Sequence, residues 1–563
     1  MAGQDRRSIR RGYAVCGDRL VHYRRAGEGP PVVLLHDSPR SSVLHLPLLR
    51  EFSDEFSVYA LDTPGYGQSD PLPADPAPAI DDFGDALAGA IGTLGLSGAT
   101  VYAYHTSSKV ALSCALRHTA LIGHLVIDGI SLPPEQVPEA FISAYMSPFD
   151  IDAEGAYIGR QWTKIRDLHR FFPWFRREVG ARIPMDEPSL EAMHAYAMDL
   201  FMAGPNYSSA YAAAMRYRAL EVLPHLETPT TFMARANDVL YGYLDTVERC
   251  LPPRATVQRL PADDAVWREQ LRALFRQPVG RPGPVPAPVA SDRKARRRYV
   301  GLDHGQVHLH ESGGGAAAVL LLHDPPGSGL DVQDLAAALD GLRIVAPDLP
   351  GCAASDPLPA PAAADDFAHA LLALMDAEGI HQFAILALGL SGPLALALVA
   401  AAGDRVTGLA LDGMPVLDAD SRGAIAGRYA PAILPARDGA HFLSTWHRLR
   451  DEQLQFPWFD GTQRAARRAE PDLDAWRLHH RLLATLMQPE RYGDACRAAL
   501  SCDPTDPAMR PAGPVLAFEV DGDPRYQGVA QWCRGLPQGR CEPRPVALSR
   551  TARILRDFFR SVA

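Results

Sequence analysis

The five-residue stretch Tyr-His-Thr-Ser-Ser, at positions 104–108, gathers side chains that are well suited to chemistry. It lies between a β-rich run and a helical run, so we expect a bend between a strand and a helix. The hydroxyl of Thr106 could act as a nucleophile if a base removed its proton, and Ser107 or Ser108 could replace it if the turn were shifted. A strained bend is unfavourable for a β-branched residue, so the sequence leaves open whether this bend is still catalytic.

The elements that must position this bend alternate between strands and helices. Strands are expected at residues 31–35, 57–62, 100–104, 124–128, 229–234 and 255–260, and helices at residues 80–95, 109–118 and 265–277. Such alternation is typical of a mainly parallel sheet with helices on both faces. About 100 residues separate the fourth and fifth strands, which is too long for a bare loop. We therefore predict a helical cap over about residues 131–225.

The chain also contains an internal repeat. The run VVLLHDSP around His36 returns as VLLLHDPP around His323, 287 positions later. The run RDLHRFFPWF at 166–175 returns as RDEQLQFPWF at 450–459, 284 positions later. A nearly constant offset predicts the duplication and fusion of one domain, with a second cap at about 415–510.

A proline-rich segment separates the two copies. Residues 278–288 contain five prolines, and the basic run RKARRR follows at 293–298. Proline at this density is typical of an extended, semi-rigid spacer. We therefore predict a first domain at residues 1–277, a linker at 278–298 and a second domain at 299–563.

The composition excludes several classes of partner. The chain is 47% hydrophobic with a net charge of −10, which argues against nucleic acid or an anionic membrane as a main partner. The eight cysteines show no CxxC spacing, and neither a signal peptide nor a membrane-spanning run is visible, so we expect a cytoplasmic protein. No cluster has metal-ligand spacing and no phosphate-binding glycine loop follows a strand, so we expect no metal and no cofactor.

Both copies resemble domains of the α/β-hydrolase superfamily. The resemblance rests on the HDSP run at 36–39, the DTPGYGQSD loop at 62–70, the bend at 104–108 and Asn237-Asp238. The runs HDSPRSS, YHTSS and RDLHRFFPWF are most similar to a bacterial group whose bend reads His-Thr-Gly. The resemblance covers nearly the whole chain outside the linker. It implies two tandem α/β-hydrolase domains, each a mainly parallel sheet with flanking helices and a helical cap.

The resemblance also implies a nucleophile, a histidine base and an acid that orients the base. Thr106 takes the nucleophile's place, and Asp238 or Asp128 takes the acid's, although Asp128 could instead cap a helix or brace a loop. The base should follow the strand that ends at Leu260, but residues 261–270 contain no histidine. A carboxylate in that loop, with a pKa of about 4, is a poor base for a hydroxyl unless burial raises its pKa.

Backbone N–H groups could complete this site. Those near Asp37 and Ser38, with that of Ser107 after the bend, could stabilise an oxyanion. The His36-Asp37 pair could equally serve only to shape a turn.

The second copy departs further from the superfamily pattern. Leu390 aligns with the candidate nucleophile, and a shift of one residue makes Ser391 the candidate there. Asp412 and Asp523 fill the acid positions, but the closing loop at 545–559 has no histidine. Neither copy therefore has an intact triad in sequence order.

Aromatic and basic side chains near the bend and in the cap could line a substrate pocket. The candidates are His105, Tyr157, Trp162, Arg166, Trp174 and Tyr241. Aromatic side chains with one arginine suit a pocket that binds a mostly apolar molecule through one polar anchor. Packing of the cap on the core would explain Trp174 equally well.

Two functions fit these observations. The first is an enzyme with a non-standard site that acts on a small apolar carbonyl compound, such as an ester, lactone or β-dicarbonyl, by hydrolysis, C–C cleavage, elimination or cyclisation. The second is a catalytically degenerate protein that binds a ligand or acts as a scaffold. We favour the enzyme, because Asp238 and the oxyanion loop remain in the first copy. The two copies could also form an intramolecular pseudo-dimer, and the chain could assemble into a further homo-oligomer.

Overall fold

The computed structural model describes residues 8–277 and 295–563. The predicted linker lies outside the described residues at positions 278–294. Its expected last residues, 295–298, begin a strand instead. Among the described residues, no helix is both long and apolar enough to cross a membrane.

The described residues form two compact units. The first unit holds residues 8–150 and 163–277. The second unit holds residues 151–162 and 295–563. The short segment 151–162 thus belongs to the first repeat in sequence and to the second unit in structure.

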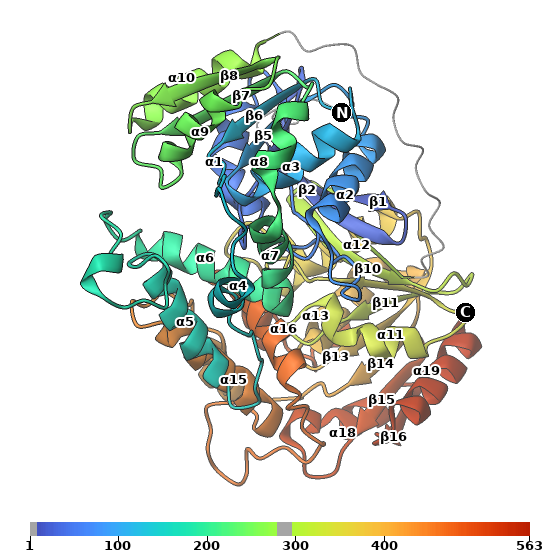
Figure 1. The fold of residues 1–563 in the computed structure, drawn as a ribbon. Coiled ribbons are helices and arrows are strands. Elements are labelled where there is room, and N and C mark those ends of the chain that lie inside the picture. Colours follow the sequence, from blue (N-terminus) through green and yellow to red (C-terminus); the bar gives the residue numbers. More distant parts are fainter. Residues whose placement is uncertain (1–7, 278–294) are drawn as a thin grey trace. The chain divides into compact units, whose positions relative to one another are not determined.

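The first unit is built on an eight-stranded sheet with the order β1-β2-β4-β3-β5-β6-β7-β8 (Figure 1). The strands are β1 (Arg10–Cys16), β2 (Arg19–Ala26), β3 (Pro31–Leu35), β4 (Ser57–Leu61), β5 (Thr100–Tyr104), β6 (His124–Asp128), β7 (Thr230–Arg235) and β8 (Ala255–Leu260). Strands β3 to β8 run parallel, whereas β2 pairs antiparallel with β1 and β4. The six predicted strands are present, and β1 and β2 were not predicted.

The second unit repeats this topology, with the order β9-β10-β12-β11-β13-β14-β15-β16. The strands are β9 (Ala295–Leu302), β10 (Gly305–Ser312), β11 (Ala318–Leu322), β12 (Arg343–Pro347), β13 (Phe383–Leu388), β14 (Val406–Asp412), β15 (Val515–Glu519) and β16 (Gly539–Pro543). The identical strand order is the structural counterpart of the sequence repeat. The predicted architecture, two tandem domains that each hold a mainly parallel sheet with flanking helices, is confirmed.

Helices flank each sheet, and further helices lie in the predicted cap segments (Figure 1). In the first unit they are α1 (Leu46–Phe52), α2 (Ile80–Thr93), α3 (Thr106–Arg117), α4 (Glu139–Tyr145), α6 (Leu190–Ala203), α7 (Ser208–Arg216), α8 (Ala219–Val222), α9 (Leu244–Arg249) and α10 (Asp264–Phe275). In the second unit they are α11 (Gln333–Ala338), α12 (Ala364–Ala377), α13 (Ser391–Ala402), α14 (Ala419–Tyr429), α15 (Ala440–Leu454), α16 (Ala475–Leu486), α17 (Asp494–Ser501), α18 (Val529–Arg534) and α19 (Leu548–Val562). Helix α5 (Ala156–Leu168) begins in the second unit and ends in the first.

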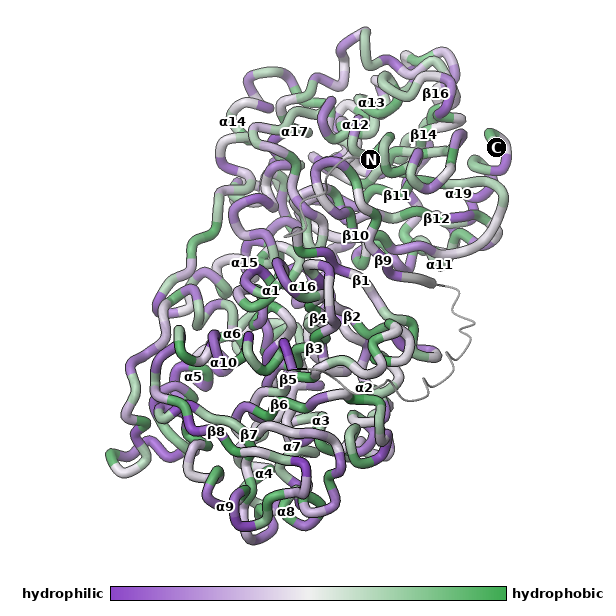
Figure 2. Tube along the Cα trace, turned by 90° about the horizontal axis from the view of Figure 1, so that it is seen from above, coloured by the Kyte–Doolittle hydropathy of each residue, from purple (hydrophilic) through white to green (hydrophobic). Residues whose placement is uncertain are grey.

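Burial of apolar side chains between sheet and helices holds each unit together. The central strands β3 and β11 are buried almost throughout, and Figure 2 shows hydrophobic colouring along the central strands. In the first unit α2 packs on α3, while Phe52 of α1 meets Phe275 of α10 with ring centroids 5.2 Å apart. Helices α4 and α6 to α8 lie within the predicted cap, residues 131–225, and α14 to α17 lie within its counterpart.

Candidate functional site

The strained residue of the first bend is His105. Strand β5 ends at Tyr104 and α3 begins at Thr106, with His105 between them at φ 50° and ψ −109°. Small residues, Ala103 and Ser107, stand two positions to either side. The imidazole, rather than the Thr106 hydroxyl, therefore occupies the position at which a strand–bend–helix turn presents a reactive side chain. The bend thus lies one residue before the position that the sequence predicts.

Hydrogen bonds from two of the candidate hydroxyls, those of Ser107 and Ser108, hold the bend in place. The backbone N–H of His105 donates to the carbonyl of Asp128. Ser107 Oγ donates to the carbonyls of Tyr104 and Leu35, and Ser108 Oγ donates to the carbonyl of Gly129 at 2.9 Å. These buried serines brace the turn against neighbouring strands.

His105 pairs with Asp238. The Nε2 atom of the imidazole lies 2.8 Å from Asp238 Oδ2, and Asp238 follows β7 in a tight turn. Asp238 also accepts the backbone N–H of Leu240 through Oδ1. A carboxylate can only accept, so Nε2 carries the proton and Nδ1 is left as the basic atom. Nδ1 makes no hydrogen bond to any residue that the structure describes.

The interaction between His105 and Asp238 favours the protonated imidazole and the ionised carboxylate. Burial alone would lower the pKa of His105, but the hydrogen bond and charge of Asp238, with the charges of Asp37 and Asp128, raise it above its usual value. Burial would raise the pKa of Asp238, but its contact with His105 lowers it. The carboxylate thus makes the imidazole a stronger base than a free histidine.

The predicted oxyanion loop lies beside this pair. Burial raises the pKa of the Asp37 carboxyl, against the charges of Arg40 and His105, and its buried Oδ1 atom makes no hydrogen bond to the residues that the structure describes. His36 shapes the turn, because its Nδ1 contacts the carbonyl of Asp37 and its Nε2 accepts the N–H of Thr63. Ser38 is buried in the same turn.

The bend also offers a backbone donor. Thr106 is the first residue of α3, so its N–H precedes the helix's own hydrogen bonds and carries part of the positive end of the helix dipole. As the residue after the bend, Thr106 takes the place that we had given to the Ser107 N–H. Thr106 thus contributes to the candidate site through its backbone.

Asp128 is held away from the imidazole. Its Oδ2 atom accepts the hydroxyl of Tyr102 at 2.9 Å and the indole N–H of Trp267 at 2.8 Å. Burial raises the pKa of Asp128 despite these bonds. Its carboxyl therefore braces β5 and α10, and it acts on His105 only through its charge.

Arg40 and several cap residues that the sequence did not indicate lie near the Asp37 side of the site. Arg40 lies over the ring of Tyr196 at 5.2 Å and donates to Asp199 at 2.8 Å. Burial, with the charge of Asp37 adding to it, raises the pKa of Tyr196 and of Tyr211. Tyrosines of α6 and α7 thus adjoin the Asp37 side of the site. No regular spacing in the sequence marks them.

The predicted pocket residues divide between the two units. Trp174 donates its indole N–H to the carbonyl of Tyr145 and supports the first cap, and Arg166 and Tyr241 are half-buried in the same unit. Tyr157 and Trp162 belong to the second unit. There Tyr157 OH contacts His479 Nδ1 at 2.7 Å, and Trp162 donates to a backbone carbonyl.

The second unit holds glycine at the corresponding bend. Gly389 has φ +56°, and a Cβ there would lie 2.2 Å from Arg525 Nη2 and 2.2 Å from Asp324 Oδ1. Arg525 and Asp324 form an ion pair of 2.6 Å. Asp324 also accepts the N–H of Leu390, the residue after the bend. The ion pair thus fills the place of a reactive side chain and occupies the backbone donor.

The candidates in the second unit have structural partners. Ser391 Oγ donates to the carbonyls of Leu388 and Leu322, as Ser107 does in the first unit. Asp412 accepts from Tyr526 OH at 2.6 Å and from Arg544 at 2.9 Å. Asp523 accepts the backbone N–H groups of three residues, Arg468, Ala469 and Arg525.

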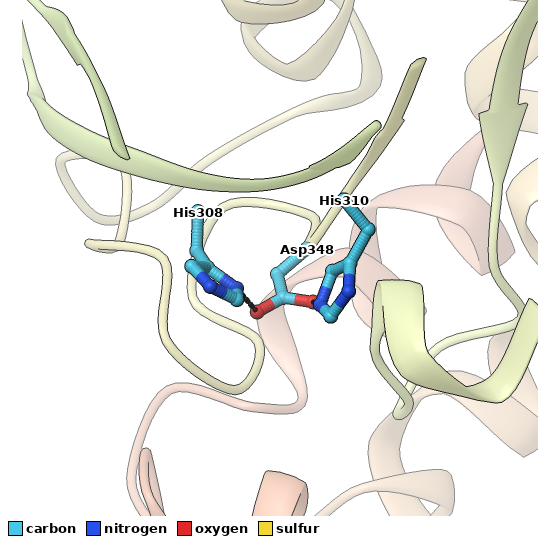
Figure 3. A group of neighbouring side chains, drawn as sticks. All are labelled: His308, His310 and Asp348. Carbon is cyan, nitrogen blue, oxygen red and sulfur yellow. Dashed lines mark hydrogen bonds and ion pairs between the residues drawn. The ribbon is translucent and has the colours of Figure 1, made fainter. Parts of the chain in front are cut away.

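His308, His310 and Asp348 form a compact group in the second unit (Figure 3). His308 Nδ1 lies 2.9 Å from Asp348 Oδ2, while His310 Nε2 is 3.9 Å from Oδ1. Asp348 also accepts the backbone N–H groups of Gly329 and Ala354. The first unit repeats the histidine–aspartate contact at His22 and Asp62, where Arg24 replaces the second histidine. The shared pair braces a strand and a loop in both units.

Both repeats match the same family of known proteins. The sequence model of the alpha/beta hydrolase fold matches residues 30–259 and 317–427. The chain belongs to the α/β-hydrolase fold family. One match falls on each repeat, so the resemblance expected from the sequence is confirmed.

Relatives of this α/β-hydrolase-fold chain include two bacterial hydrolases. The (E)-2-((N-methylformamido)methylene)succinate hydrolase of Acinetobacter baylyi is 30% identical over 126 residues, which cover 22% of this chain and 47% of the relative. The 2-(acetamidomethylene)succinate hydrolase of Mesorhizobium japonicum is 27% identical over 154 residues, which cover 26% and 55%. The chain thus spans about half the length of these curated relatives.

A solved structure is similar at a lower level. The malate-bound thermophilic esterase of Thermogutta terrifontis is 19% identical, with a TM-score of 0.37. The match covers 47% of this chain and 99% of the esterase.

Proposed function

We propose that the first unit hydrolyses a small carbonyl compound by general acid–base catalysis, with His105 as the base. The observation that carries this proposal is the pairing of His105 Nε2 with Asp238 Oδ2 at 2.8 Å, on a residue held in the strained bend. Strain of this kind persists where the surrounding structure holds a side chain in place for a task. Asp238 keeps the role of orienting acid that the sequence predicts, and the His105 imidazole takes the place of the Thr106 hydroxyl as the reactive group.

The reaction needs no serine. Nδ1 of His105 accepts a proton from water as the water oxygen bonds to the carbonyl carbon. The oxyanion that forms is stabilised by the backbone N–H of Thr106 at the start of α3. When the carbon–oxygen or carbon–nitrogen bond to the leaving group breaks, the leaving group takes the proton back from His105.

Asp238 has two effects in this scheme. Its carboxylate holds the proton on Nε2, which directs the lone pair of Nδ1 toward the reacting water. Its charge also stabilises the imidazolium that exists while the oxyanion is present. The contact with His105 lowers the pKa of Asp238, which favours the ionised carboxylate.

The substrate class follows from the surroundings and the relatives. Aromatic side chains of the cap, Tyr196 and Tyr211 among them, favour a small and mostly apolar compound such as an ester or lactone. The names of the two bacterial relatives describe hydrolysis of enamide-type succinates. Amides of this type therefore join esters and lactones as candidate substrates. A base at the same position could also serve elimination, cyclisation or C–C cleavage.

A second candidate function is ligand binding without catalysis. The observation that favours it is that neither bend holds a hydroxyl, since His105 stands at one and Gly389 at the other. Under this alternative the pairing of His105 with Asp238 would position a ligand. The two candidates differ in whether removal of the imidazole abolishes turnover or only weakens binding.

We also propose that the repeats derive from a symmetric dimer. Within the second unit, a Cβ at Gly155 would lie 2.8 Å from the ring of Trp446, and a Cβ at Gly439 would lie 2.6 Å from the ring of Trp162. Each partner of the first contact is 284 positions from its counterpart in the second. Reciprocal contacts of this kind, here within one unit, are what the fusion of two symmetric copies would leave.

A panel of p-nitrophenyl esters, lactones and N-acyl enamines tests the proposed activity. We expect turnover by the wild-type chain, a loss of roughly 100- to 10,000-fold in His105→Ala, and a change below about threefold in Thr106→Ala. The Thr106 variant is the matched control, since it removes the neighbouring hydroxyl and keeps the backbone N–H. Loss of turnover in Thr106→Ala with retention in His105→Ala would refute the assignment. Binding of a panel member without turnover would favour the second candidate.

A further inference from the structure

The place that corresponds to the first unit's site has a different set of charges in the second unit. Three arginines converge there from separate elements. Arg525 follows β15 in a short 3-10 turn, Arg481 lies on α16, and Arg467 lies in the loop before α16. Asp324, at the end of β11, faces the same bend.

None of these arginines has a basic counterpart in the first unit. The repeat offset of 284 to 285 residues relates Arg467 to Ile183, Arg481 to Tyr196 and Arg525 to Leu240, where the matching N-caps Ser189 and Asp474 set the second pair. The register is secure near the first pair, because the bridge between Phe171 and Arg182 is repeated between Gln455 and Ala466. The second unit has therefore exchanged three uncharged side chains for guanidinium groups.

The three guanidinium groups form one electrostatic cluster. Burial lowers the pKa of Arg467, and the positive charge of Arg525 lowers it further. The charge of Arg525 also acts on Arg481. The charge of Asp324 opposes these effects at all three arginines. Shared contacts link the three residues: Arg467 donates to the carbonyl of Glu452, whose carboxylate lies 3.4 Å from Arg481. Arg467 also lies 3.7 Å from Asp523, which accepts the backbone N–H of Arg525. Like charges in one buried region are unfavourable unless negative charge is supplied.

The cluster leaves donors unused. The Nε atoms of Arg467, Arg481 and Arg525 are all buried and make no hydrogen bond to the residues that the structure describes. The Arg525 side chain is only 6% exposed. A buried donor without an acceptor destabilises the fold, and more so when the group is charged. Asp324 is 23% exposed, so the cluster can be reached from solvent.

Carboxylates lie among these arginines. Arg448 and Arg481 share Glu452, Arg467 lies 3.7 Å from Asp523, and Arg525 pairs with Asp324. Asp331 also acts on Arg481 through its charge, and burial raises the pKa of that carboxyl.

We propose that the second unit binds a small organic carboxylate at this cluster, through the guanidinium groups of Arg467, Arg481 and Arg525. Arginine suits a carboxylate because its planar guanidinium can donate two parallel hydrogen bonds. The glycine at position 389 leaves room for the Arg525 side chain where a reactive side chain would otherwise stand. The second unit thus becomes a binding module that carries no reactive group at its bend.

Isothermal titration of the full-length chain with acetate and benzoate tests this proposal, against chloride at the same ionic strength. We expect saturable binding of the carboxylates, with one site assigned by mutation to the second unit. Arg525→Leu, which installs the first unit's residue, should weaken binding by roughly tenfold or more. The exposed Arg534→Leu is the matched control, and it should bind as the wild type does.

Asp324→Asn separates a binding role from a structural one. Asp324 competes with an added carboxylate for Arg525, so its neutralisation should tighten binding of acetate and benzoate. The Asp324 variant is expected to bind the carboxylates more tightly than the wild type, which a misfolded protein would not do. It therefore keeps the test decisive even if Arg525→Leu fails to fold. Absence of saturable binding by wild type and Asp324→Asn, or equal binding of chloride, would overturn the proposal, as would weaker binding in Asp324→Asn. None of these results bears on turnover at His105.

Discussion

The two bends share a backbone and differ in what they present. In the first unit the strained position holds an imidazole that pairs with Asp238, and the Nδ1 atom is left for chemistry. In the second unit that position holds Gly389, and the ion pair of Arg525 with Asp324 fills the space. The bracing serines Ser107 and Ser391 are retained in both. Duplication therefore preserved the scaffold of the bend while its chemistry diverged.

The largest expected effect comes from making the first bend like the second. His105→Gly removes the proposed base and should lower kcat/KM by roughly 100- to 10,000-fold on any substrate found. The matched change in the second unit, Arg525→Leu, should leave kcat/KM within about twofold. Steady-state kinetics of both variants measures the contrast. A greater loss in the Arg525 variant would place catalysis in the second unit.

The next effect concerns the dependence of activity on pH. The base works in its neutral form, and the raised pKa of His105 places the acidic limb of the kcat/KM profile above the ordinary histidine value. Asp238→Asn removes the charge and hydrogen bond that raise this pKa, so the limb should move to lower pH and the maximal rate should fall. A limb that stays in place would show that Asp238 does not control the base.

The reciprocal glycine contacts are expected to have a moderate effect on stability. Gly155 and Gly439 have φ values of +75° and +79°, and each lies against a tryptophan ring. Gly155→Ala and Gly439→Ala should each destabilise the chain by about 1–3 kcal/mol, by similar amounts. Thermal unfolding of the two variants tests this symmetry. A cost confined to one of them would contradict a two-fold origin.

The smallest effect is predicted for the second unit's serine. Ser391→Ala should lower stability by about 1 kcal/mol, because its Oγ is buried and hydrogen-bonded, and should leave turnover unchanged. Ser107→Ala should cost a similar free energy of unfolding. Turnover that depended on Ser391 would mean that the second bend is catalytic.

Much of the fold could be predicted from the sequence. Buried parallel strands are continuous apolar runs, so β3 and β6 were predicted with the observed bounds. Strands β1 and β2 were missed because they lie at the antiparallel edge, where several basic residues interrupt the apolar pattern. The topology of the second unit followed from the repeat itself.

The site was harder to predict for a physical reason. The sequence prediction located the bend from its hydroxyl side chains. The residues that permit the close approach of strand and helix are instead the small Ala103 and Ser107, two positions to either side of His105. That spacing was a signal in the sequence. The arginine cluster had no such signal, because Arg467 and Arg525 are 58 positions apart and meet only through the fold.

A ¹⁵N NMR titration of the His105 ring, with Asp238→Asn as the comparison, tests whether His105 is the base. We expect the neutral ring to carry its proton on Nε2, and its pKa to lie above the ordinary histidine value and to fall in Asp238→Asn. A proton on Nδ1, or a pKa that does not respond to Asp238→Asn, would contradict the assignment of this pair as the base of the first unit.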